Sequence, residues 1–379
     1  MKIAIDTRPV AKRKAGIGQY VFNIVKKLSE IDKENEYILF GGPIKSLGKN
    51  FRQKRLIGKI QRIFNTLWKR IYFPPIEWLV GKVDLVHFTN FVVLPTFAKR
   101  IILNIYDLSY LAHPEFAEKK NLTLLKKFVP VSIEKATKII TISKFSKSQI
   151  IKHFKVPEDK IFVIYPAANE EFKPLSNLDR EKVKRKYKLE KDFILYLGTL
   201  EPRKNVETLI KAYNELPLIK EEFDLVIAGE RGWLYSNIFK LVKKLYLEDK
   251  IKFLGYVSDQ ERVLLYNLAT VFVFPSFYEG FGMPPLEAMA CGTPVICSNT
   301  SSLPEVCEDA ALYIDPYNLD DLKEALSKLL TDESLRKKLA GLGFEQARKF
   351  SWLDSAKKTL EVYRIVYSGY EKEEWRSKK

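Results

Sequence analysis

Two charged pairs in the second half of the sequence have residue types and spacing that suit binding to phosphates and sugar hydroxyls. Arg203 and Lys204 are adjacent cations in the segment 198–205, between a predicted strand and a predicted helix. Two neighbouring cations at the carboxyl end of a strand can neutralise a diphosphate. Glu279 and Glu287 stand eight residues apart, and each carboxylate can accept hydrogen bonds from a pair of hydroxyl groups.

The loop that carries Glu279 also contributes backbone donors. Its next three residues, Gly280–Gly282, can offer several N–H groups to a phosphate or sugar oxygen. Two prolines after Met283 suit the first turn of a helix, which places Glu287 in that turn. Glu287 has a purely structural alternative, as a negative charge that favours the positive end of the helix dipole. A structural role is less natural for Glu279, because it lies in a loop among glycines.

A glycine pair near the amino terminus is a weaker candidate for phosphate binding. Gly16 and Gly18 precede a predicted helix over Tyr20–Ile31. Glycine lets the backbone approach a ligand closely there, and amides at a helix N-terminus attract phosphate. The full GxGxxG fingerprint and the Walker GxxxxGK[ST] motif are absent. By itself the pair is equally consistent with a flexible turn.

Short apolar strands alternate with amphipathic helices along the chain, and these elements must position the charged residues. The predicted strands are Lys2–Asp6, Tyr37–Phe40, Asp84–Phe88, Ile101–Ile105, Lys138–Ile142, Ile161–Tyr165, Phe193–Leu197, Asp224–Ala228, Ile251–Leu254, Val271–Phe274, Val295–Cys297 and Leu312–Ile314. Such alternation predicts an α/β fold of two doubly wound Rossmann-like domains with parallel sheets. We expect domains at 1–170 and 171–354, with a C-terminal helix at about 355–379 packing back on the first.

The composition excludes several classes of protein. With 379 residues, 46% of them apolar and 13% aromatic, the chain is too rich in core residues to be disordered and long enough for two cores. It contains no apolar run of the roughly 18 residues that a membrane-spanning helix needs. Its start reads as a strand and not as a signal peptide, and its three cysteines show no metal-ligand spacing. We therefore expect a reduced, cytoplasmic protein.

All of the net charge of +17 lies in the first half of the chain. Residues 1–170 hold 31 Lys and Arg against 14 Asp and Glu, whereas the remainder holds 33 of each. The densest stretch, residues 44–82, contains ten basic residues and one acid, with Ile57, Ile60, Phe64, Leu67 and Trp68 at helical spacing. This pattern predicts an amphipathic helix that lies on an anionic membrane. The alternative is an ordinary surface helix packed on its own domain.

The charged pairs and several other segments together resemble glycosyltransferase family 4, a family with the GT-B fold of two Rossmann-like domains. Its E-x7-E signature matches Glu279 and Glu287, and the segment 198–205 resembles its diphosphate loop. Residues 302–306, 309–312 and 350–352 resemble downstream segments of the family, and residues 104–115 resemble the acceptor-side loop of bacterial mannosyltransferase-like members.

The resemblance implies a role for each candidate residue. Arg203 and Lys204 would hold the diphosphate of a nucleotide-sugar donor, and the pair Gly16 and Gly18 would approach it from the other domain. Glu279 would bind donor-sugar hydroxyls, and Glu287 the ribose diol. Further donor contacts would come from Phe281, Gly282 and Met283 through their backbone and from Tyr256 and Val257 near the base, with Asp107 as a further catalytic candidate.

One position departs from the pattern of many family members, which carry His-Asp where this chain has Tyr106-Asp107. The family histidine often lies beside the donor sugar. Tyr106 can donate a hydrogen bond there, but a phenol is not a base near neutral pH. His87 and His113 are the nearby histidines, and a lone histidine at a strand end, such as His87, is more often structural.

The resemblance implies a retaining hexosyltransferase that uses no metal, because the chain lacks a DxD motif. We expect a hexose, with mannose from GDP-mannose favoured, to pass to a growing glycan or a lipid-linked acceptor in polysaccharide or lipopolysaccharide assembly. Association with the inner face of the cell membrane would explain the basic half. The alternatives are a nucleotide-sugar epimerase of the same fold and, more remotely, a nucleic-acid-binding protein. We expect no nucleic acid partner, since the sequence shows no such module.

Overall fold

The chain folds into two compact units. The computed structural model describes residues 1–10, 16–54, 63–64, 66–68, 71–176, 180–189 and 191–377. Unit 1 comprises Met1–Tyr110, Lys119–Pro166 and the segment that begins at Ser351, and unit 2 comprises Leu111–Glu118 and Ala167–Phe350. The sequence predicted the border between the two domains at residue 170 and the return of the chain to the first domain at about residue 355. It also placed residues 111–118 in the first domain, but the structure groups them with unit 2.

Unit 1 contains a seven-stranded sheet in the order β3-β2-β1-β4-β5-β6-β7, with every neighbouring pair parallel. Its strands are β1 (Lys2–Thr7), β2 (Glu36–Gly41), β3 (Phe51–Lys54), β4 (Leu85–Phe88), β5 (Ile101–Asn104), β6 (Lys138–Thr141) and β7 (Ile161–Val163). The predicted strands all occur, whereas β3 was missed. Exposed and half-buried residues alternate along β3, so its sequence lacks the apolar run that marks the other strands.

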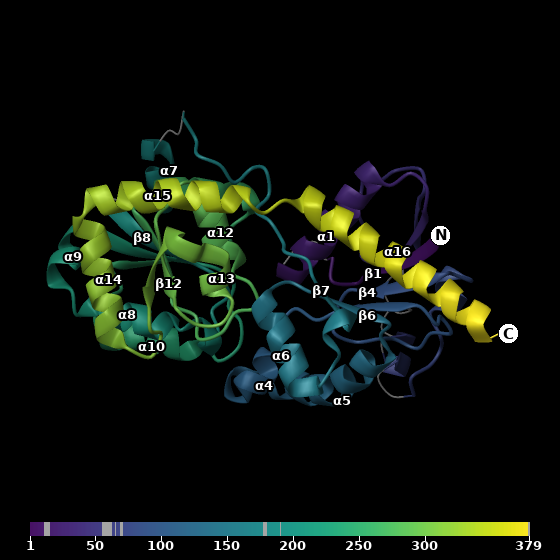
Figure 1. The fold of residues 1–379 in the computed structure, drawn as a ribbon. Helices are drawn as coiled ribbons and strands as arrows, with labels where there is room; N and C mark the ends of the chain where they lie inside the picture. The colour runs from purple at the N-terminus through teal and green to yellow at the C-terminus, as the bar shows by residue number, and fades with distance from the viewer. Residues whose placement is uncertain are drawn as a thin grey trace. The chain divides into compact units, whose positions relative to one another are not determined.

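Helices connect the strands of unit 1. They are α1 (Gly16–Ile31), α3 (Glu77–Val80), α5 (Lys119–Lys135), α6 (Lys144–Phe154) and α16 (Trp352–Ser377), with the 3-10 turn η2 (Glu158–Lys160). Helix α4 (Ser109–Ala112) begins in unit 1, and its last two residues are grouped with unit 2. The last helix, α16, runs alongside α1 (Figure 1). The rings of Tyr20 on α1 and Trp352 on α16 meet edge to face at 5.7 Å. The final helix thus belongs to the same unit as the first strands.

Unit 2 contains a six-stranded parallel sheet in the order β10-β9-β8-β11-β12-β13. Its strands are β8 (Asp192–Leu197), β9 (Phe223–Ala228), β10 (Ile251–Gly255), β11 (Val271–Phe274), β12 (Val295–Ser298) and β13 (Ala311–Ile314). Its helices are α7 (Arg180–Tyr187), α8 (Val206–Asn214), α9 (Pro217–Glu222), α10 (Ser236–Lys244), α11 (Asp259–Leu268), α12 (Met283–Ala290), α13 (Leu303–Cys307), α14 (Leu319–Thr331) and α15 (Glu333–Arg348), with 3-10 turns η1 (Pro114–Phe116), η3 (Pro202–Lys204) and η4 (Glu308–Ala310). The predicted α/β fold with two parallel sheets is confirmed.

The core of unit 2 explains why its central strands read as continuous apolar runs. All four residues of β11 and of β12 are buried, because helices cover both faces of the sheet. Helix α8 buries the face that carries Val206, Leu209, Ile210 and Tyr213. Helix α11 begins with a capping box in which Ser258 and Glu261 satisfy each other's backbone amides.

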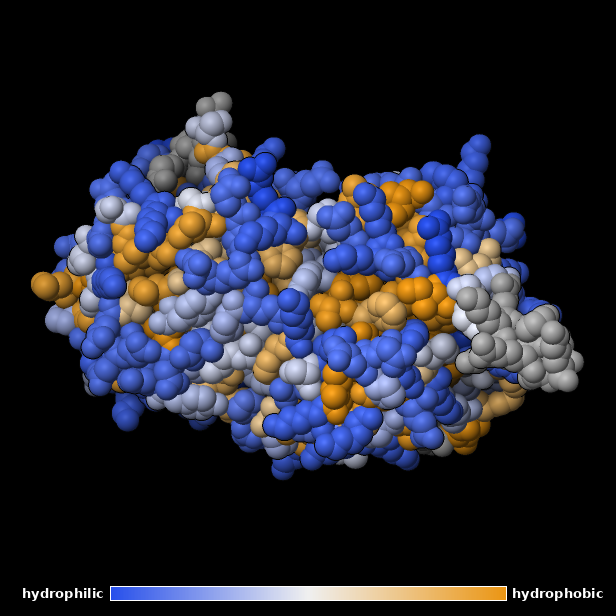
Figure 2. Space-filling model, in the orientation of Figure 1, coloured by the Kyte–Doolittle hydropathy of each residue, from blue (hydrophilic) through white to orange (hydrophobic). Residues whose placement is uncertain are grey.

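Three further observations concern the surface and the thiols. The face drawn in Figure 2 is mostly hydrophilic, with hydrophobic side chains gathered in separate patches. Within the described residues, no helix combines the length and apolar character that crossing a bilayer requires. Cys291, Cys297 and Cys307 are buried free thiols, and burial raises the pKa of Cys291 to about 12.

Candidate active site

The topology of unit 2 brings the two charged segments together. Strands β8 and β11 are parallel neighbours, so the loops that follow them leave the same edge of the sheet side by side. The loop after β8 contains the turn η3 with Arg203 and Lys204, and the loop after β11 contains Glu279. Asn205 ends the turn in the left-handed conformation, with φ of 57°, which lets α8 begin at the next residue.

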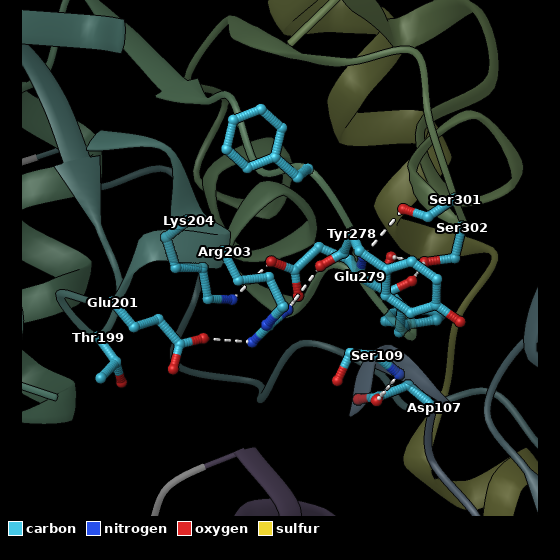
Figure 3. A network of polar contacts seen from close by, with 12 residues as sticks. Asp107, Ser109, Thr199, Glu201, Arg203, Lys204, Tyr278, Glu279, Ser301 and Ser302 are labelled. Carbon is cyan, nitrogen blue, oxygen red and sulfur yellow. Dashed lines mark hydrogen bonds and ion pairs between the residues drawn. The ribbon is translucent and has the colours of Figure 1, made fainter. Parts of the chain in front are cut away.

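Glu279 is the centre of an ion-pair cluster (Figure 3). Its Oε1 lies 2.6 Å from the Lys204 ammonium, and its Oε2 lies 3.1 Å from Nη1 of Arg203. The same guanidinium donates to the carbonyl oxygen of Tyr278 and to the carboxylate of Glu201, each at 2.6 Å. Arg203 is therefore tied to the Glu279 loop at two points and to its own loop at a third.

The cluster is buried, which strengthens the attraction between its opposite charges. Glu279 is 8% exposed, Lys204 9% and Glu201 3%. Burial by itself would raise the pKa of the Glu279 carboxyl, but the charges of Arg203 and Lys204 outweigh it and hold that pKa at about 2. Burial and the like charge of Arg203 lower the pKa of the Lys204 ammonium, and the Glu279 carboxylate opposes them. Glu279 is thus an anion at every physiological pH.

Two serines that the sequence analysis did not single out hold the backbone of Glu279 in place. Ser301 accepts a hydrogen bond from the Glu279 N–H at 2.9 Å. Ser302 donates to the carbonyl oxygens of Glu279 at 2.9 Å and Phe281 at 2.8 Å. Ser302 was noted only as part of a family-like segment. A pair of serines before a helix predicts a helix N-cap. This pattern does not indicate which loop the serine hydroxyls contact.

The next residues of the same loop turn sharply into α12. Gly282 has φ of +118°, and a Cβ atom added there would lie 2.7 Å from Cδ2 of Leu303. Any side chain would therefore be strained and crowded at this position. Phe281 is buried and packs edge to face on Phe350 at 5.5 Å between ring centroids. Met283 is the first residue of α12.

A second glycine that sequence reasoning missed is needed where the loops after β8 and β9 meet. Gly229 has φ of +147°, and a Cβ there would lie 1.9 Å from the carbonyl oxygen of Gly198. The Gly198 amide in turn donates to the carbonyl of Ala228 at 3.0 Å. Close backbone contact between these loops thus fixes the start of the Arg203–Lys204 segment.

Glu287 lies beyond the first turn of α12, the turn in which the sequence had placed it, and forms a separate polar cluster with residues of α11. Its carboxylate pairs with Arg262, and its Oε2 accepts from the Tyr266 hydroxyl at 3.1 Å. The side chain is buried, so it does more than favour a helix dipole at the surface. Tyr256 and Val257 follow β10, and the Tyr256 side chain is 47% exposed whereas Val257 is buried.

The other predicted residues belong to unit 1. Gly16 and Gly18 do not precede α1, as predicted, but form its first turn, and Gly18 is buried. The carboxylate of Asp107 accepts a hydrogen bond from the Ser109 amide at 2.8 Å, at the start of α4. That these residues act together with Glu279 stays a prediction.

Tyr106 and His87 are engaged inside unit 1. Tyr106 is buried, and its hydroxyl donates to the carbonyl of Thr89 at 2.7 Å, so it is not presented as a donor to a ligand. His87 lies between Asn104, 2.6 Å from Nε2, and the hydroxyl of Tyr363 on α16, 2.8 Å from Nδ1. Burial lowers the pKa of His87 to about 4. His87 is therefore a neutral, structural residue.

The segment 111–118 carries its own ring contacts to the Glu279 loop. His113 meets the ring of Tyr278 at 5.9 Å, and Phe116 stacks on Phe277 at 5.3 Å. Trp233 donates from Nε1 to the carbonyl oxygen of Phe116 at 2.5 Å. The predicted acceptor-side loop thus ends in a segment that packs on the residues directly before Glu279.

Comparison with known proteins places this site in a family. A model described as Glycosyltransferase Family 4 matches residues 15–172, and one described as Glycosyl transferases group 1 matches residues 179–345. The chain is 35% identical over 382 residues to the O-antigen chain mannosyltransferase B of Escherichia coli, covering 97% of this chain and 100% of that protein. It is 35% identical over 268 residues to the serotype-specific mannosyltransferase WbdA of Escherichia coli, covering 69% of this chain and 32% of that protein.

Solved structures agree on the architecture. Sucrose-phosphate synthase from Thermosynechococcus elongatus superposes with a TM-score of 0.79 at 21% identity, covering 97% of this chain and 99% of that chain. At this identity the likeness concerns the fold. The chain therefore belongs to glycosyltransferase family 4 and has the GT-B fold. It is a glycosyltransferase, as the sequence predicted.

Proposed function

We propose that this enzyme transfers mannose from GDP-mannose to a growing, lipid-linked polysaccharide, with retention of the anomeric configuration. The observation that carries the proposal is the buried cluster of Lys204, Arg203 and Glu279 in a chain that matches an O-antigen chain mannosyltransferase over nearly the full length of both proteins. Cations beside a carboxylate suit a substrate in which a diphosphate is joined to a sugar.

The geometry supports different roles for the two cations. Arg203 already bonds Glu201, Glu279 and the Tyr278 carbonyl, so its main effect is to hold the two loops together and to add positive charge. An ammonium carries three N–H donors, and Lys204 uses one of them on Glu279. Lys204 is therefore the cation that we assign to direct contact with the donor diphosphate.

The reaction we propose is a displacement on one face of the sugar. The bond between the anomeric carbon and the diphosphate oxygen breaks while the acceptor hydroxyl oxygen forms its bond on the same face. The departing diphosphate oxygen takes the acceptor proton, so no protein base is required. Lys204 and Arg203 stabilise the charge that develops on the diphosphate, and the Glu279 carboxylate stabilises the positive charge that develops on the sugar ring.

The remaining donor contacts follow the family pattern. We assign the ribose diol to Glu287, whose carboxylate Arg262 and Tyr266 already orient. Tyr256 and Val257 would lie near the base, and backbone groups of Phe281, Gly282 and Met283 near the sugar. Gly16, Gly18 and Asp107 would act from unit 1, with the glycines near the diphosphate and Asp107 near the acceptor.

Mannosyl transfer from GDP-mannose is tested by measuring nucleotide release from GDP-mannose, UDP-glucose, ADP-glucose and dTDP-glucose with a mannoside acceptor that carries an alkyl chain. We expect GDP release only with GDP-mannose and only with acceptor present, and an α-linked product by NMR. Preference for another donor would overturn the choice of mannose. Conversion of the donor sugar without acceptor would favour the epimerase alternative, which the transferase names of the full-length and partial relatives disfavour.

A lipid-linked acceptor places the reaction beside a membrane. We therefore propose that the enzyme works peripherally on the inner face of the cell membrane and that its excess of 17 positive charges faces anionic lipid and not nucleic acid. We propose no cofactor and no metal, because Lys204 and Arg203 supply the positive charge that a divalent ion supplies to a diphosphate elsewhere.

A further inference from the structure

Among the described residues of unit 1, four large apolar side chains between positions 71 and 97 are exposed. Ile71 is 61% exposed, Phe73 44%, Trp78 68% and Phe97 74%. We call the three aromatic residues, Phe73, Trp78 and Phe97, the aromatic patch. Trp and Phe side chains are mostly buried in soluble proteins, and a cluster of exposed ones marks an interaction surface.

One carboxylate holds the two halves of the aromatic patch beside each other. Oε1 of Glu77, the residue before Trp78, accepts hydrogen bonds from the hydroxyl of Thr96 at 2.5 Å and from the amide of Phe97 at 2.9 Å. The rings of Phe73 and Trp78 meet edge to face at 5.0 Å. The patch is therefore a preformed surface built from two segments of chain, because Glu77 fixes the backbone on both sides.

The exposed charges next to the aromatic patch are mainly positive. Lys99 follows Phe97 by two residues, Lys82 follows Trp78 by four, and both are exposed. Lys135 is exposed as well and lies over the ring of Tyr72 at 4.3 Å, with Glu134 as an exposed acid beside it. The carboxylate of Asp84 is occupied by the amide of Lys2 at 2.7 Å.

The aromatic patch shares residues with the stretch 44–82 that the sequence predicted to lie on a membrane, but Trp68 of that stretch takes no part in it. Trp68 was expected on the outer face of an amphipathic helix, but it is 3% exposed, donates from Nε1 to the carbonyl of Pro74 at 2.8 Å and lies under the guanidinium of Arg8. Residues 51–54 of the same stretch form β3. Ile57 and Ile60, with Arg55 and Lys59, lie outside the described residues.

We propose that the aromatic patch docks on the surface of an anionic lipid bilayer, with Trp78, Phe97 and Phe73 among the headgroups and Lys82, Lys99 and Lys135 facing the lipid phosphates. Aromatic side chains favour the membrane–water interface, and lysines near an anionic leaflet add electrostatic attraction. The inference rests on the proposed function only in that a lipid-linked acceptor requires a membrane nearby. Vesicle binding measures it without any transfer of sugar.

The test uses the full chain and vesicles of equimolar phosphatidylglycerol and phosphatidylcholine. We expect wild type to co-sediment with these vesicles and hardly with pure phosphatidylcholine. The double substitution Trp78→Ser and Phe97→Ser should lower the partition coefficient at least about tenfold. The matched control is Leu218→Ser with Tyr246→Ser, since these residues of unit 2 are 79% and 88% exposed. It should bind like wild type.

A second variant gives a local readout that does not depend on lost binding. Trp78→Phe keeps the patch apolar, so it should still bind, but lipids with brominated acyl chains should quench much less of its tryptophan emission than of wild-type emission. The proposal would be overturned by equal quenching in wild type and Trp78→Phe, or by undiminished binding of the double variant. Transfer of sugar to a soluble acceptor would be unaffected by either result. Absence of vesicle binding together with dimerisation that Trp78→Ser abolishes would show a protein interface instead.

Discussion

The ammonium of Lys204 lies 2.6 Å from Oε1 of Glu279, and both residues are buried. In the absence of donor, the carboxylate that we assign to the sugar therefore neutralises the cation that we assign to the diphosphate. Arriving phosphate oxygens can take over this ammonium and leave the carboxylate for sugar hydroxyls and for positive charge on the ring. The pair is thus poised for an exchange of partners.

We expect Glu279→Gln and Lys204→Ala each to lower kcat by about 10²–10³, the usual effect of removing one preorganised electrostatic contact. The fold should survive, because Glu279 keeps Arg203 at 3.1 Å when Lys204 is removed, and a glutamine at position 279 still accepts a hydrogen bond. The measurement is the initial rate at saturating donor, with circular dichroism to verify folding.

The matched control for these substitutions is Lys323→Ala, which breaks an exposed pair with Glu215 and Asp320 elsewhere in unit 2. Exposed pairs contribute little, so this variant should keep wild-type kcat. Near-wild-type turnover by Glu279→Gln or Lys204→Ala would show that the reaction takes place elsewhere.

Ser302→Ala should lower kcat about tenfold, because the two carbonyl oxygens that position the Glu279 loop lose their common donor, at a cost of about 1–2 kcal/mol. Affinity for GDP alone, measured by calorimetry, should stay within about twofold, since the diphosphate cations lie on another loop. Ser148→Ala removes a similar hydroxyl-to-carbonyl bond on the surface of α6 and should change neither quantity. An equal loss of GDP affinity in Ser302→Ala would argue for a general disturbance of unit 2.

The sheets were predictable from the sequence because buried parallel strands are short apolar runs. Strand β11, Val271–Phe274, is such a run, and its predicted bounds match. Strand β3 was missed because it is an edge strand that pairs with β2 alone, and three of its four residues are polar. The prediction that Trp68 lies on the outer face of an amphipathic helix was wrong for a related reason. Helical spacing identifies an apolar face but does not show whether the protein's own residues cover it.

The site was predictable as far as local motifs reach. Adjacent cations after one strand and a carboxylate after its neighbour suffice to bring Lys204 and Glu279 together once β8 and β11 pair. The supports come from distant sequence: Ser302 follows Glu279 by 23 residues, and its hydroxyl shows no pattern that names its partner. Tyr106 likewise occupies the position of a family histidine, but only its packing shows that its hydroxyl bonds Thr89.

Chelation should leave transfer nearly unchanged. With Lys204 and Arg203 as the positive charges at the diphosphate, EDTA should alter the rate by less than about twofold, or about 0.4 kcal/mol of barrier. Among the residues that the structure describes, no group of three or more His, Cys, Asp or Glu side chains is arranged to hold a metal ion. A strict requirement for Mg²⁺ or Mn²⁺, restored by titration after EDTA, would contradict the roles assigned to the two cations.

Stability should fall as the pH drops from 6.5 towards 4, because His87 is held neutral. Its Nε2 faces an amide oxygen, which only accepts, so Nε2 carries the proton and Nδ1 accepts from Tyr363. Burial lowers the pKa of His87 to about 4, whereas an unfolded histidine titrates near 6.5. Between pH 6.5 and pH 4 the unfolded chain therefore binds more protons than the folded chain. The contribution of His87 to stability is complete above pH 6.5 and is lost as the pH falls towards 4.

This linkage amounts to at most about 1.4 kcal/mol per pH unit, so the Tm of wild type should fall by about 4–8 °C between pH 7 and 5 through His87. His87→Gln removes the titrating ring and keeps an amide that can donate to Asn104, and its Tm should depend less on pH by that amount. His153→Gln is the matched control, because His153 is exposed on α6 and its substitution should leave the pH dependence intact. Glu279 does not affect the comparison between pH 7 and pH 5, because its carboxyl titrates near pH 2 in the folded chain and below pH 5 in the unfolded chain. An unchanged pH dependence in His87→Gln would mean that another group carries the titration.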